Sequence, residues 1–580
     1  MRPTPVTRLA LSVLASVVVT TGVFVPAAEA SPRPQQEEAS RAKALSVRFI
    51  GMNDLHGNLQ PPEMSSGRVT LDDGTTVNAG GAAYLATHVK QLRAAADHSI
   101  IVSSGDNIGA SPLFSALFHD EPTIEVLNAI KVRASAVGNH EFDEGFAELK
   151  RIRRGGCNKA DGCQFRKHYR GTDFHYLGAN VRRTKDNTRA LKPYTIRTVE
   201  GIRIGIIGVT LQNLPSVVVP SAVKGLKFGD EVAAINATSK VLARKGVKAQ
   251  VVLMHQGDET EGGGGPNSCN VEASVGYAIA TKASSQVDAI FSGHSHQQYN
   301  CTVTDPHGQP RPFIQGLSFG RLLSVVDLLI SRRTHDVIRK STVANNVIVT
   351  RDVTPDPKVQ AIIDRAVRLS APIANRPVGK ITADLVREAG PSGESPLGDV
   401  IADAQLAATT SNGAVIAVTN PGGIRAGLTY ASSLAGEGDG VVTYAEAFTV
   451  QPFGNIMQTI SLTGAQLKAV LEQQWQPQPD GTVTTRVLQI SDSLHYAWSR
   501  SAPIGSKISN ITVAGTPVDP AATYRVSVNN FLAGGGDGFT VFADGTNVVG
   551  GPIDLDAFTA YLTAHQPLSP PATNRITVSG

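Results

Sequence analysis

The sequence carries almost no excess charge of either sign, since 53 Lys and Arg stand against 49 Asp and Glu in 580 residues. The first 30 residues hold two of these cations and one of the acids, so the chain without them has a formal charge of +3. A balance this close to neutral argues against a protein that binds nucleic acid through bulk charge. No internal repeat is visible, which argues against a repeat architecture.

Long apolar runs are also scarce, and the one that occurs lies at the N-terminus. Residues 9–25 form this run, basic residues precede it, and Ala28-Glu29-Ala30 follows as a small-x-small cleavage site, which is typical of an export signal. An uncleaved membrane anchor is the alternative, but Thr20, Thr21 and Gly22 interrupt the run. The residue directly after the site is Ser31 and not a cysteine that could carry a lipid, and the C-terminus has no hydrophobic tail. We therefore expect a secreted protein without a membrane anchor.

Cysteine is rare, and all four cysteines follow the expected cleavage site. An even number in an exported protein predicts two disulfides. Three pairings are possible, and we expect the local one, Cys157 with Cys163 and Cys269 with Cys301. A zinc site built from Cys and His is the alternative, but these spacings match no common zinc finger.

The length predicts more than one folded domain, because 580 residues exceed what one hydrophobic core normally holds. Strand-like and helix-like runs alternate up to about Val349, which indicates an α/β domain of layered sheets and helices. An amphipathic helix at 358–369, ended by Ala371-Pro372 and Arg376-Pro377, is the expected linker to a second α/β domain. The expected order is signal peptide (1–30), polar arm (31–44), first domain (45–353), linker (354–377) and second domain (378–580).

The most informative pattern is a series of five clusters of acids, amides and histidines in the first domain. Four of them closely follow short apolar, β-branched runs of strand length, at 47–50, 100–102, 251–253 and 287–291. Because the loops beyond the carboxyl ends of strands converge in α/β sheets, these clusters can meet. The clusters are Asp54-Leu55-His56, Gly105-Asp106-Asn107, Gly138-Asn139-His140-Glu141, Met254-His255 and Gly293-His294-Ser295-His296.

These side chains offer the oxygen and imidazole ligands that suit divalent cations acting on phosphate. Asp106 can bridge two ions, and Asp54 and His56, two apart on an expected extended segment, can reach one ion together. Each residue alone has a simpler explanation in ordinary packing, but the five clusters together predict a site for two metal ions. Two ions that share a water lower its pKa from about 15.7 toward 7, which gives a hydroxide able to attack phosphorus.

The clusters resemble those of the calcineurin-like metallophosphoesterases, and the run from Gly138 to Asp143 resembles the 5′-nucleotidase branch. The resemblance implies a four-layer sandwich of sheets and helices, and it implies two divalent ions such as Mn, Zn or Co. It also implies that His140 stabilises the transition state with Asp143 as its partner, although His140 could instead be a third ligand or merely structural. The implied ligands are Asp54, His56, Asp106 and His296 for one ion, and Asp106, Asn139, His255 and His294 for the other.

Three loops of the second domain resemble the 5′-nucleotidase C-terminal domain. One loop places Arg425 beside glycines, an arrangement suited to an anionic oxygen. The other two place Phe453 and Phe531 beside glycines, and each Phe alone would be explained by core packing. The resemblance implies that these rings stack a nucleobase and that Asp537 binds ribose hydroxyls. It also implies substrate contacts from Asn420, Arg425 and Asn455.

The expected function is that of a secreted two-metal phosphoesterase that hydrolyses extracellular nucleotides, as 5′-nucleotidases do. One departure opens alternatives: family members often carry further arginines before the helix expected at Leu397, where this chain has Gly393-Glu394-Ser395 and only Arg387 lies nearby. A UDP-sugar pyrophosphatase or a 2′,3′-cyclic-nucleotide phosphodiesterase would use the same site. A non-catalytic nucleotide-binding or adhesion protein is a third alternative, and the complete ligand set argues against it.

Overall fold

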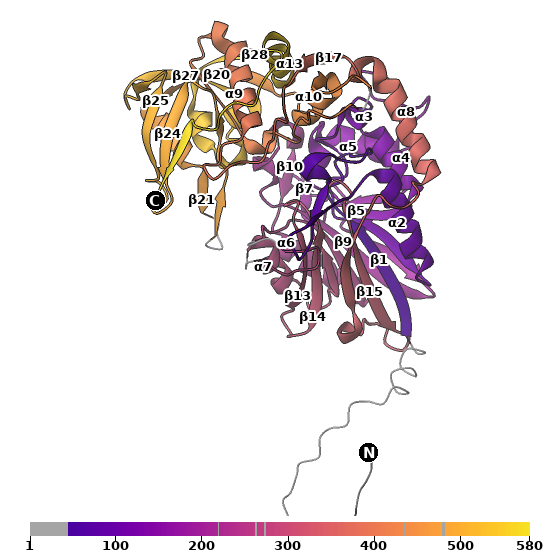
Figure 1. The fold of residues 1–580 in the computed structure, drawn as a ribbon. Coiled ribbons are helices and arrows are strands. Elements are labelled where there is room, and N and C mark those ends of the chain that lie inside the picture. The colour runs from indigo at the N-terminus through magenta and orange to yellow at the C-terminus, as the bar shows by residue number, and fades with distance from the viewer. Residues whose placement is uncertain (1–43, 219, 261–263, 272–273, 434–435, 478–481) are drawn as a thin grey trace, which may run out of the picture. The chain divides into compact units, whose positions relative to one another are not determined.

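The computed structural model describes residues 44–218, 220–260, 264–271, 274–433, 436–477 and 482–580. The expected export signal (1–30) and the polar arm up to residue 43 lie outside these residues. Residues 45–580 form one compact unit, drawn from indigo to yellow in Figure 1. Within the described ranges, no helix has both the length and the apolar character needed to cross a membrane.

Two six-stranded sheets form the centre of the N-terminal part, residues 44–356 (Figure 1). Four neighbouring strands of each sheet run parallel, so their carboxyl ends lie at one edge. The first sheet has the order β16 (Val343–Ile348), β15 (Leu322–Ser331), β1 (Ala44–Met52), β4 (Ser99–Ser103), β5 (Val132–Ala136) and β6 (His175–Leu177). The second has the order β13 (Gln298–Thr304), β14 (Pro310–Gly316), β12 (Ala289–Phe291), β11 (Ala249–His255), β9 (Ile202–Thr210) and β8 (Tyr194–Val199).

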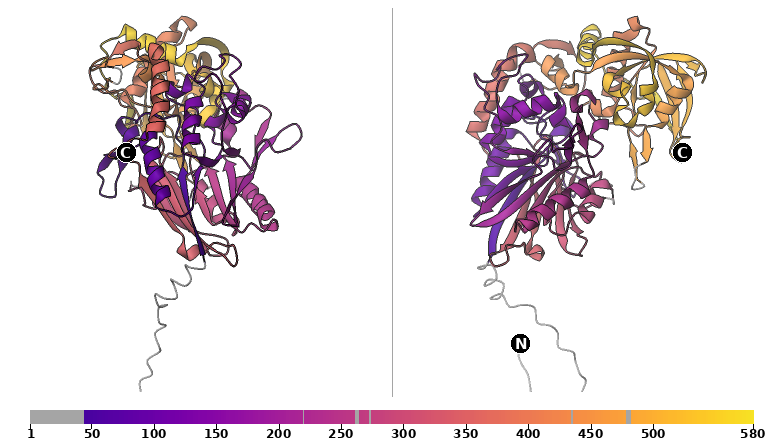
Figure 2. Two further views of the ribbon diagram at one scale, coloured as in Figure 1. Left: turned by 90° about the vertical axis from the view of Figure 1, so that its right-hand side faces the viewer. Right: turned by 180° about the vertical axis from the view of Figure 1, so that it is seen from behind.

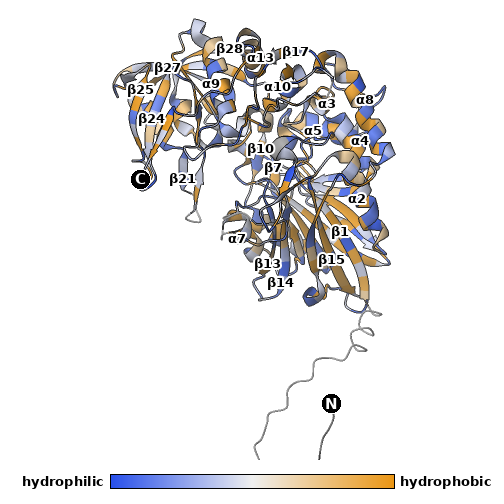
Figure 3. Ribbon diagram, viewed as in Figure 1, coloured by the Kyte–Doolittle hydropathy of each residue, from blue (hydrophilic) through white to orange (hydrophobic). Residues whose placement is uncertain are grey.

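The two sheets pack against each other and carry helices on their outer faces. Along β1, Val47 and Phe49 join the core between the sheets, whereas Ile50 and Met52 join the core under the helices. Both faces of β1 are therefore apolar, which is why the strand reads as a nearly continuous hydrophobic run (Figure 3). The helices over the first sheet include α2 (Ala82–Ala94) and α4 (Glu121–Ala129), and those over the second are α6 (Glu231–Arg244) and α7 (Val275–Lys282). The layered α/β sandwich that the resemblance implies is confirmed.

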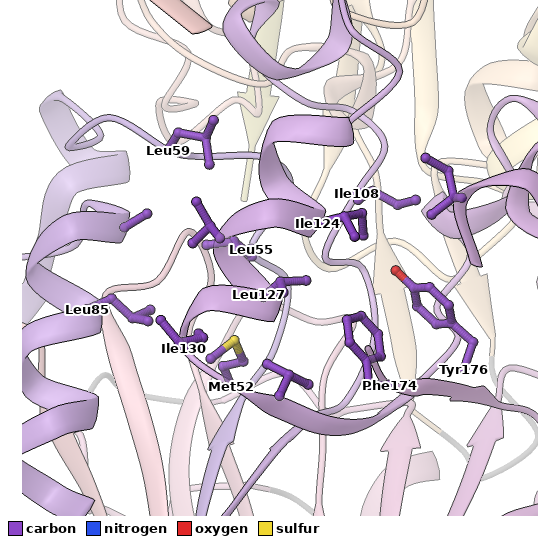
Figure 4. Packing of buried hydrophobic residues seen from close by; sticks show 14 of the residues in the cluster. Met52, Leu55, Leu59, Leu85, Ile108, Ile124, Leu127, Ile130, Phe174 and Tyr176 are labelled. Carbon is purple, nitrogen blue, oxygen red and sulfur yellow. The ribbon is translucent and has the colours of Figure 1, made fainter. Parts of the chain in front are cut away.

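The core under the helices of the first sheet lies next to the loops that carry the predicted ligands. Leu127 of α4 and Leu85 of α2 pack towards Met52 at the end of β1 (Figure 4). Leu55, which separates two predicted ligands in sequence, belongs to the same core and is 2 % exposed. Burial of this leucine anchors the ligand loop to the helices.

The expected linker helix is longer than the sequence pattern indicates. Helix α8 (Pro357–Ala374) begins with the Asp356 carboxylate accepting the Val359 N–H at 2.9 Å, and it continues past Pro372. The expected end at Ala371-Pro372 is therefore wrong. Ala366, Ser370 and Ala374 bury one face of the last turns, and this packing outweighs the hydrogen bond that proline cannot donate.

The C-terminal part, residues 375–580, holds a five-stranded sheet and a four-stranded sheet (Figure 2). Helices α9 (Pro396–Thr409) and α13 (Asp554–Ala564) share one apolar core with α10 (Tyr444–Val450), and α11 (Gly464–Glu472) packs in another core between the sheets. The larger sheet has the order β23 (Gln489–Ile490), β18 (Ile416–Thr419), β27 (Thr523–Asn529), β20 (Ile456–Thr463) and β28 (Thr546–Ile553). The smaller has the order β26 (Thr516–Pro517), β25 (Ile508–Val513), β24 (Leu494–Ser499) and β29 (Ile576–Ser579).

Both disulfides join cysteines that are neighbours in the sequence order. Cys157 is bonded to Cys163, and Cys269 is bonded to Cys301. The first bond closes a loop just after α5 (Gly145–Arg154), and the second ties a loop to β13. Since all four sulfurs are paired, a zinc site built from these cysteines is excluded.

His119 attaches the first disulfide loop to the rest of the N-terminal part. Its Nδ1 lies 2.6 Å from Glu144 Oε2, and its Nε2 lies 3.0 Å from Asp161 Oδ2 inside the loop. The hydrogen bond to Glu144 raises the pKa of His119 to about 9, with Asp161 adding to the effect and burial opposing it.

We expect the contribution of His119 to stability to depend on pH. A folded pKa above the unfolded value of about 6.5 means that the stabilisation is complete below about pH 6 and is lost as pH rises through 9. His119→Gln should lower the free energy of unfolding by up to about 1 kcal/mol at pH 6 and leave it unchanged at pH 10, in urea titrations. An equal loss at both pH values would show that the contact does not depend on a charged imidazole.

Candidate functional site

All five predicted clusters lie at the carboxyl ends of strands, at one edge of the two sheets. Three clusters follow β1, β4 and β12 as the sequence indicates, and Met254-His255 forms the last two residues of β11. The fifth cluster, Gly138 to Glu141, follows β5, a strand that the sequence pattern did not reveal. Arg133 and Ser135 interrupt the apolar run of β5, whereas its register with β4 and β6 places it firmly in the sheet.

Several of the predicted ligands have left-handed backbone. Asp54 and His56 have φ of 48° and 46°, so the expectation that they lie on an extended segment is wrong. A tight loop, not strand alternation, turns both side chains inward. Such conformations are unfavourable for residues other than glycine and tend to persist where function requires the geometry. The other predicted ligands with positive φ are Asp106 (48°), His294 (77°) and His296 (58°).

The first predicted ligand group is closely packed, and all its members are buried except His296, which is partly exposed. His56 Nε2 lies 3.1 Å from His296 Nε2 and 3.7 Å from Asp106 Oδ2. His296 Nε2 in turn lies 3.5 Å from Asp54 Oδ1. The other ring nitrogen of His56, Nδ1, is 2.8 Å from the carbonyl of Gly109. This contact orients the imidazole so that Nε2 faces the acids.

The second predicted group shares Asp106 with the first. His255 Nε2 lies 3.0 Å from Asp106 Oδ2 and 3.1 Å from Asn139 Oδ1. His255 Nδ1 is 2.8 Å from the carbonyl of Ser104, and the ring of His294 is 5.3 Å from that of His255. Asp106 Oδ2 therefore lies between the two groups, as a bridging carboxylate requires.

The residues present fit divalent cations. The imidazoles of His56 and His255 donate Nδ1–H to backbone carbonyls, the arrangement that fixes the inward Nε2 as a metal ligand. Burial lowers the pKa of His294 to about 3, so this ring is neutral and can bind a metal. Burial opposes a charge on His255, but the Asp106 carboxylate raises the pKa of His255 to about 9. Among the described residues, the groups with ligand atoms within 4.8 Å of one another include Asp54, His56 and His296, and Asp106, His255 and His294.

His140 is held beside these groups by two carboxylates. Its Nδ1 lies 2.9 Å from Asp143 Oδ2, and its backbone N–H donates to Asp106 Oδ1 at 2.8 Å. Burial would lower the pKa of His140, but Asp143 and Asp106 outweigh it and raise this pKa. The ring is 5.7 Å from that of Phe453 and nearly parallel to it. A protonated imidazole at this position can donate Nε2–H to an anionic oxygen.

Glu141 organises the loops, a role that the sequence did not reveal although the residue lies in the motif. Its Oε2 accepts the N–H groups of Asp106 at 2.9 Å and of Gly138 at 2.5 Å, and its Oε1 accepts the Asn107 N–H at 2.9 Å. Burial and the Asp106 charge raise the pKa of Glu141 to about 7. One side chain thus joins the loops that follow β4 and β5.

We expect Glu141→Gln to weaken both the fold and metal binding. The amide NH2 that replaces one oxygen would face backbone N–H donors, which leaves buried donors without acceptors at a cost of about 1–3 kcal/mol. Metal affinity should fall roughly tenfold to a hundredfold, as for other residues that orient ligands. Urea denaturation and metal titration check both effects. Glu144→Gln, at an exposed glutamate three residues away, is the control and should keep wild-type metal affinity.

A cavity of about 200 Å³ joins this cluster to the C-terminal part, and we call it the substrate cavity. From the N-terminal part it is lined by the metal-site and catalytic candidates Asp106, Asn139, His140, Asp143 and His294. All six predicted substrate-binding residues line it from the other side: Asn420, Arg425, Phe453, Asn455, Phe531 and Asp537.

Arg425 and Asp537 have different surroundings within the substrate cavity. The Arg425 guanidinium lies 5.7 Å from the centre of the Phe453 ring, and its buried Nη2 has no hydrogen-bond partner among the described residues. Burial and the charge of Arg387 lower the pKa of Arg425 to about 10, so it stays charged at neutral pH and suits an anionic oxygen. Asp537 Oδ2 instead accepts the Asn420 amide at 2.8 Å.

The stretch before α9 supplies no cation to the cavity. Glu394 is buried there, and its carboxylate accepts the N–H groups of Arg575 and Ile576. Arg387 donates to the carbonyls of Ile424 and Arg425 and so supports the loop that carries Arg425.

Arg486 also lines the substrate cavity and was not predicted. The single signal in the sequence is that it is the only Lys or Arg between Lys468 and Arg500. Arg486 directly follows the short strand β22 (Val483–Thr485). No glycine-rich loop marks its position in the sequence, as one does for Arg425.

Comparisons with known proteins agree with this geometry. The calcineurin-like phosphoesterase family matches residues 47–298, and the 5′-nucleotidase C-terminal domain matches residues 377–544. The chain is 32 % identical to endonuclease YhcR of Bacillus subtilis over 93 % of its own length, but it spans only 41 % of that protein. It is 33 % identical to cell wall protein Lmo0130 of Listeria monocytogenes, with 90 % of this chain and 67 % of that protein covered.

A solved structure shows the same fold. The 5′-nucleotidase precursor of Thermus thermophilus is 26 % identical with a TM-score of 0.75, and the match covers 92 % of this chain and 99 % of that one. The chain therefore belongs to the 5′-nucleotidase family of metal-dependent phosphoester hydrolases, in which a calcineurin-like phosphoesterase domain precedes a 5′-nucleotidase C-terminal domain.

Proposed function

We propose that this protein is an extracellular hydrolase of nucleotide phosphoesters of the 5′-nucleotidase type. The observation that carries the proposal is the substrate cavity, in which His140 and the predicted metal ligands face Phe453, Phe531 and Asp537. A metal cluster alone would suit any phosphoester. Two aromatic rings and a carboxylate opposite it suit a nucleoside.

The catalytic proposal assigns separate tasks to the residues around the phosphate. Two divalent ions, held by the two predicted ligand groups, would supply an activated water and positive charge at phosphorus. Arg425 would bind a phosphoryl oxygen through its unpaired Nη2. His140, oriented by Asp143, would donate Nε2–H to a phosphoryl or leaving oxygen, where negative charge develops.

The C-terminal part would select the nucleoside. A base stacked on Phe453 and Phe531 gains roughly 1–3 kcal/mol per base from such contacts. The carboxylate of Asp537, which Asn420 orients, can accept hydrogen bonds from ribose hydroxyls. Asn455 is held by its amide donating to Asp554 Oδ2 at 3.0 Å, which leaves its carbonyl oxygen for the substrate.

Two observations and one prediction from the sequence support an extracellular location. The two disulfides are typical of oxidising compartments. A relative that is 33 % identical over the 552 aligned residues is named a cell wall protein. The third is the export signal expected at residues 1–30.

Hydrolysis of a diester or a pyrophosphate is the second candidate, because a second cavity of about 170 Å³ meets the site at Arg425 and Phe319. Phe319 lies edge-on to His56 and His296, with ring centres 6.0 and 5.5 Å apart. The second group bonded to the phosphate of such a substrate would fit in this second cavity. UDP-sugar pyrophosphatase and 2′,3′-cyclic-nucleotide phosphodiesterase activities both fit this description.

A substrate panel tests these proposals on one preparation of the protein. AMP, UDP-glucose, 2′,3′-cyclic AMP and an aryl phosphate are compared by kcat/KM, and bound metal is measured in the same sample. We expect AMP to be the best substrate and chelation to abolish turnover until Mn or Zn is restored. Equal rates on the aryl phosphate and AMP would contradict nucleotide selection. Turnover that survives exhaustive chelation would contradict the metal mechanism.

A further inference from the structure

The substrate cavity contains two arginines in different surroundings. Arg425 interacts electrostatically with Asp106 and Asp143 of the catalytic cluster. Arg486 instead lies beside Asp537, and the two residues line the same cavity. A nucleoside 5′-monophosphate has one anionic group, which Arg425 and the metal site already serve. The second cation therefore needs its own explanation.

Arg486 is held next to Asp537 by a short chain of hydrogen bonds. Its Nη1 donates to Gln476 Oε1 at 3.2 Å, and Gln476 Nε2 donates to the carbonyl of Asp537 at 2.7 Å. The backbone N–H of Arg486 also donates to the carbonyl of Gln474 at 2.8 Å. Both the backbone and the guanidinium of Arg486 are thus fixed relative to Asp537.

The Asp537 carboxylate does not account for this cation through an ion pair. Among the described residues, no carboxylate oxygen lies within 4.0 Å of an Arg486 nitrogen, whereas Asp537 Oδ2 is bonded to Asn420. Burial raises the pKa of Asp537, and the nearby Arg486 charge opposes this rise. The pair is close enough to interact and still leaves the guanidinium open to the cavity.

We propose that Arg486 forms, beside Asp537, a subsite for a second phosphate carried on the 3′ or 2′ oxygen of the ribose. The inference rests on the proposed function. With ribose hydroxyls at Asp537, a phosphate on either oxygen lies at the guanidinium, which suits phosphate oxygens through paired N–H donors. The substrates are nucleoside 3′,5′- or 2′,5′-bisphosphates, or oligonucleotides with a 5′-phosphate. Hydrolysis breaks the bond between phosphorus and O5′, while water supplies the new P–O bond and the proton on O5′.

A purely structural role for Arg486 involves the N-terminal part. Glu259, whose carboxylate accepts the Gln297 amide at 2.6 Å, is the acid there whose pKa Arg486 influences. If Arg486 only joins the two parts through Glu259, then Glu259→Gln should reproduce the effect of Arg486→Gln on every substrate. Glu259→Gln is therefore the matched control.

The test compares kcat/KM for AMP, adenosine 3′,5′-bisphosphate, adenosine 2′,5′-bisphosphate and 5′-phosphorylated diadenylate in the metal-loaded protein. We expect Arg486→Gln to lower kcat/KM for substrates with a second phosphate about tenfold, or about 1.4 kcal/mol, through KM. The kcat/KM for AMP should change less than about twofold, and Arg486→Lys should retain part of the preference for substrates with a second phosphate. Asp537→Asn should lower kcat/KM for AMP, whose ribose loses its contact, more than kcat/KM for the bisphosphates. A higher kcat/KM for adenosine 3′,5′-bisphosphate than for the diadenylate would show that the subsite prefers a phosphate monoester, and the reverse would show that it prefers a diester.

Two results would overturn the subsite. One is that Arg486→Gln lowers kcat/KM for AMP and for the bisphosphates equally. The other is that Glu259→Gln changes kcat/KM as Arg486→Gln does on every substrate. Thermal melting of each variant identifies losses that come from misfolding, and in that case Arg486→Lys provides the comparison. If the wild-type protein hydrolyses none of these nucleotides, the proposed function fails. If it hydrolyses AMP but its kcat/KM for the bisphosphates and the diadenylate does not depend on Arg486, only the subsite fails.

Discussion

Asp106→Asn should abolish turnover and release metal together. Asp106 Oδ2 lies 3.0 Å from His255 and 3.7 Å from His56, so one carboxylate serves both ligand groups. Asparagine keeps the shape but removes the charge and one of the two carboxylate oxygens. We expect kcat/KM for AMP to fall at least about a thousandfold, which corresponds to about 4 kcal/mol of transition-state stabilisation.

Metal analysis and steady-state kinetics on the same sample check this prediction. Asp327→Asn is the matched control, because Asp327 lies in the same sheet on β15 and pairs with Arg48 far from the cluster. Asp327→Asn should keep the wild-type metal content and the wild-type kcat/KM for AMP. An Asp106→Asn protein that retained two ions per chain would show that Asp106 is not the bridge.

His140→Asn should reduce turnover by a hundredfold to ten-thousandfold while the metal content stays unchanged. The range is that of a general acid or a positioned proton donor. Asparagine can still accept or donate one hydrogen bond, but it cannot carry the positive charge that Asp143 and Asp106 favour on the imidazole. The loss should appear in kcat, since the interaction forms with the charge that develops during reaction.

The alternative role of His140 predicts a different outcome. Ligand atoms of His56, Asp106 and His140 lie within 4.8 Å of one another, so a ligand at this position is geometrically possible. Loss of metal from His140→Asn would identify a ligand. Asp143→Asn provides the second comparison, because it keeps the imidazole and removes the carboxylate 2.9 Å from Nδ1. We expect a smaller loss of kcat from Asp143→Asn, with full metal content.

Most of the ligand candidates could be located from the sequence because strands end where apolar runs end. Runs such as 47–50 and 251–253 mark β1 and β11, and polar residues that can bind a metal, Asp54 and His255, follow them within four residues. The fifth cluster was recognised by its motif alone, since β5 is only partly apolar. Gly138 of this motif is required by the space available. A Cβ at this position would lie 2.0 Å from Asp106 Oδ1, so no other residue fits beside that carboxylate.

The roles of Glu141 and Arg486 could not be predicted, because each depends on contacts with residues distant in the sequence. Glu141 accepts N–H groups from a loop that begins 35 residues earlier. Arg486 lines the substrate cavity because the β21 (Trp475–Pro477) and β22 pair places Gln476 between it and Asp537. Neither arrangement leaves a periodic pattern or a local motif.

The sequence by itself determined the class of fold and the set of ligand candidates, and it limited the disulfides to three possible pairings. Those features depend on apolar periodicity and on residue type, which are local properties of the chain. Only the tertiary structure decided that Asp54 and His56 turn inward through left-handed backbone, that α8 continues past Pro372, and that Arg486 joins the substrate cavity. Each of these follows from packing between segments distant in sequence, which outweighs local conformational preference once the sheets and helices assemble.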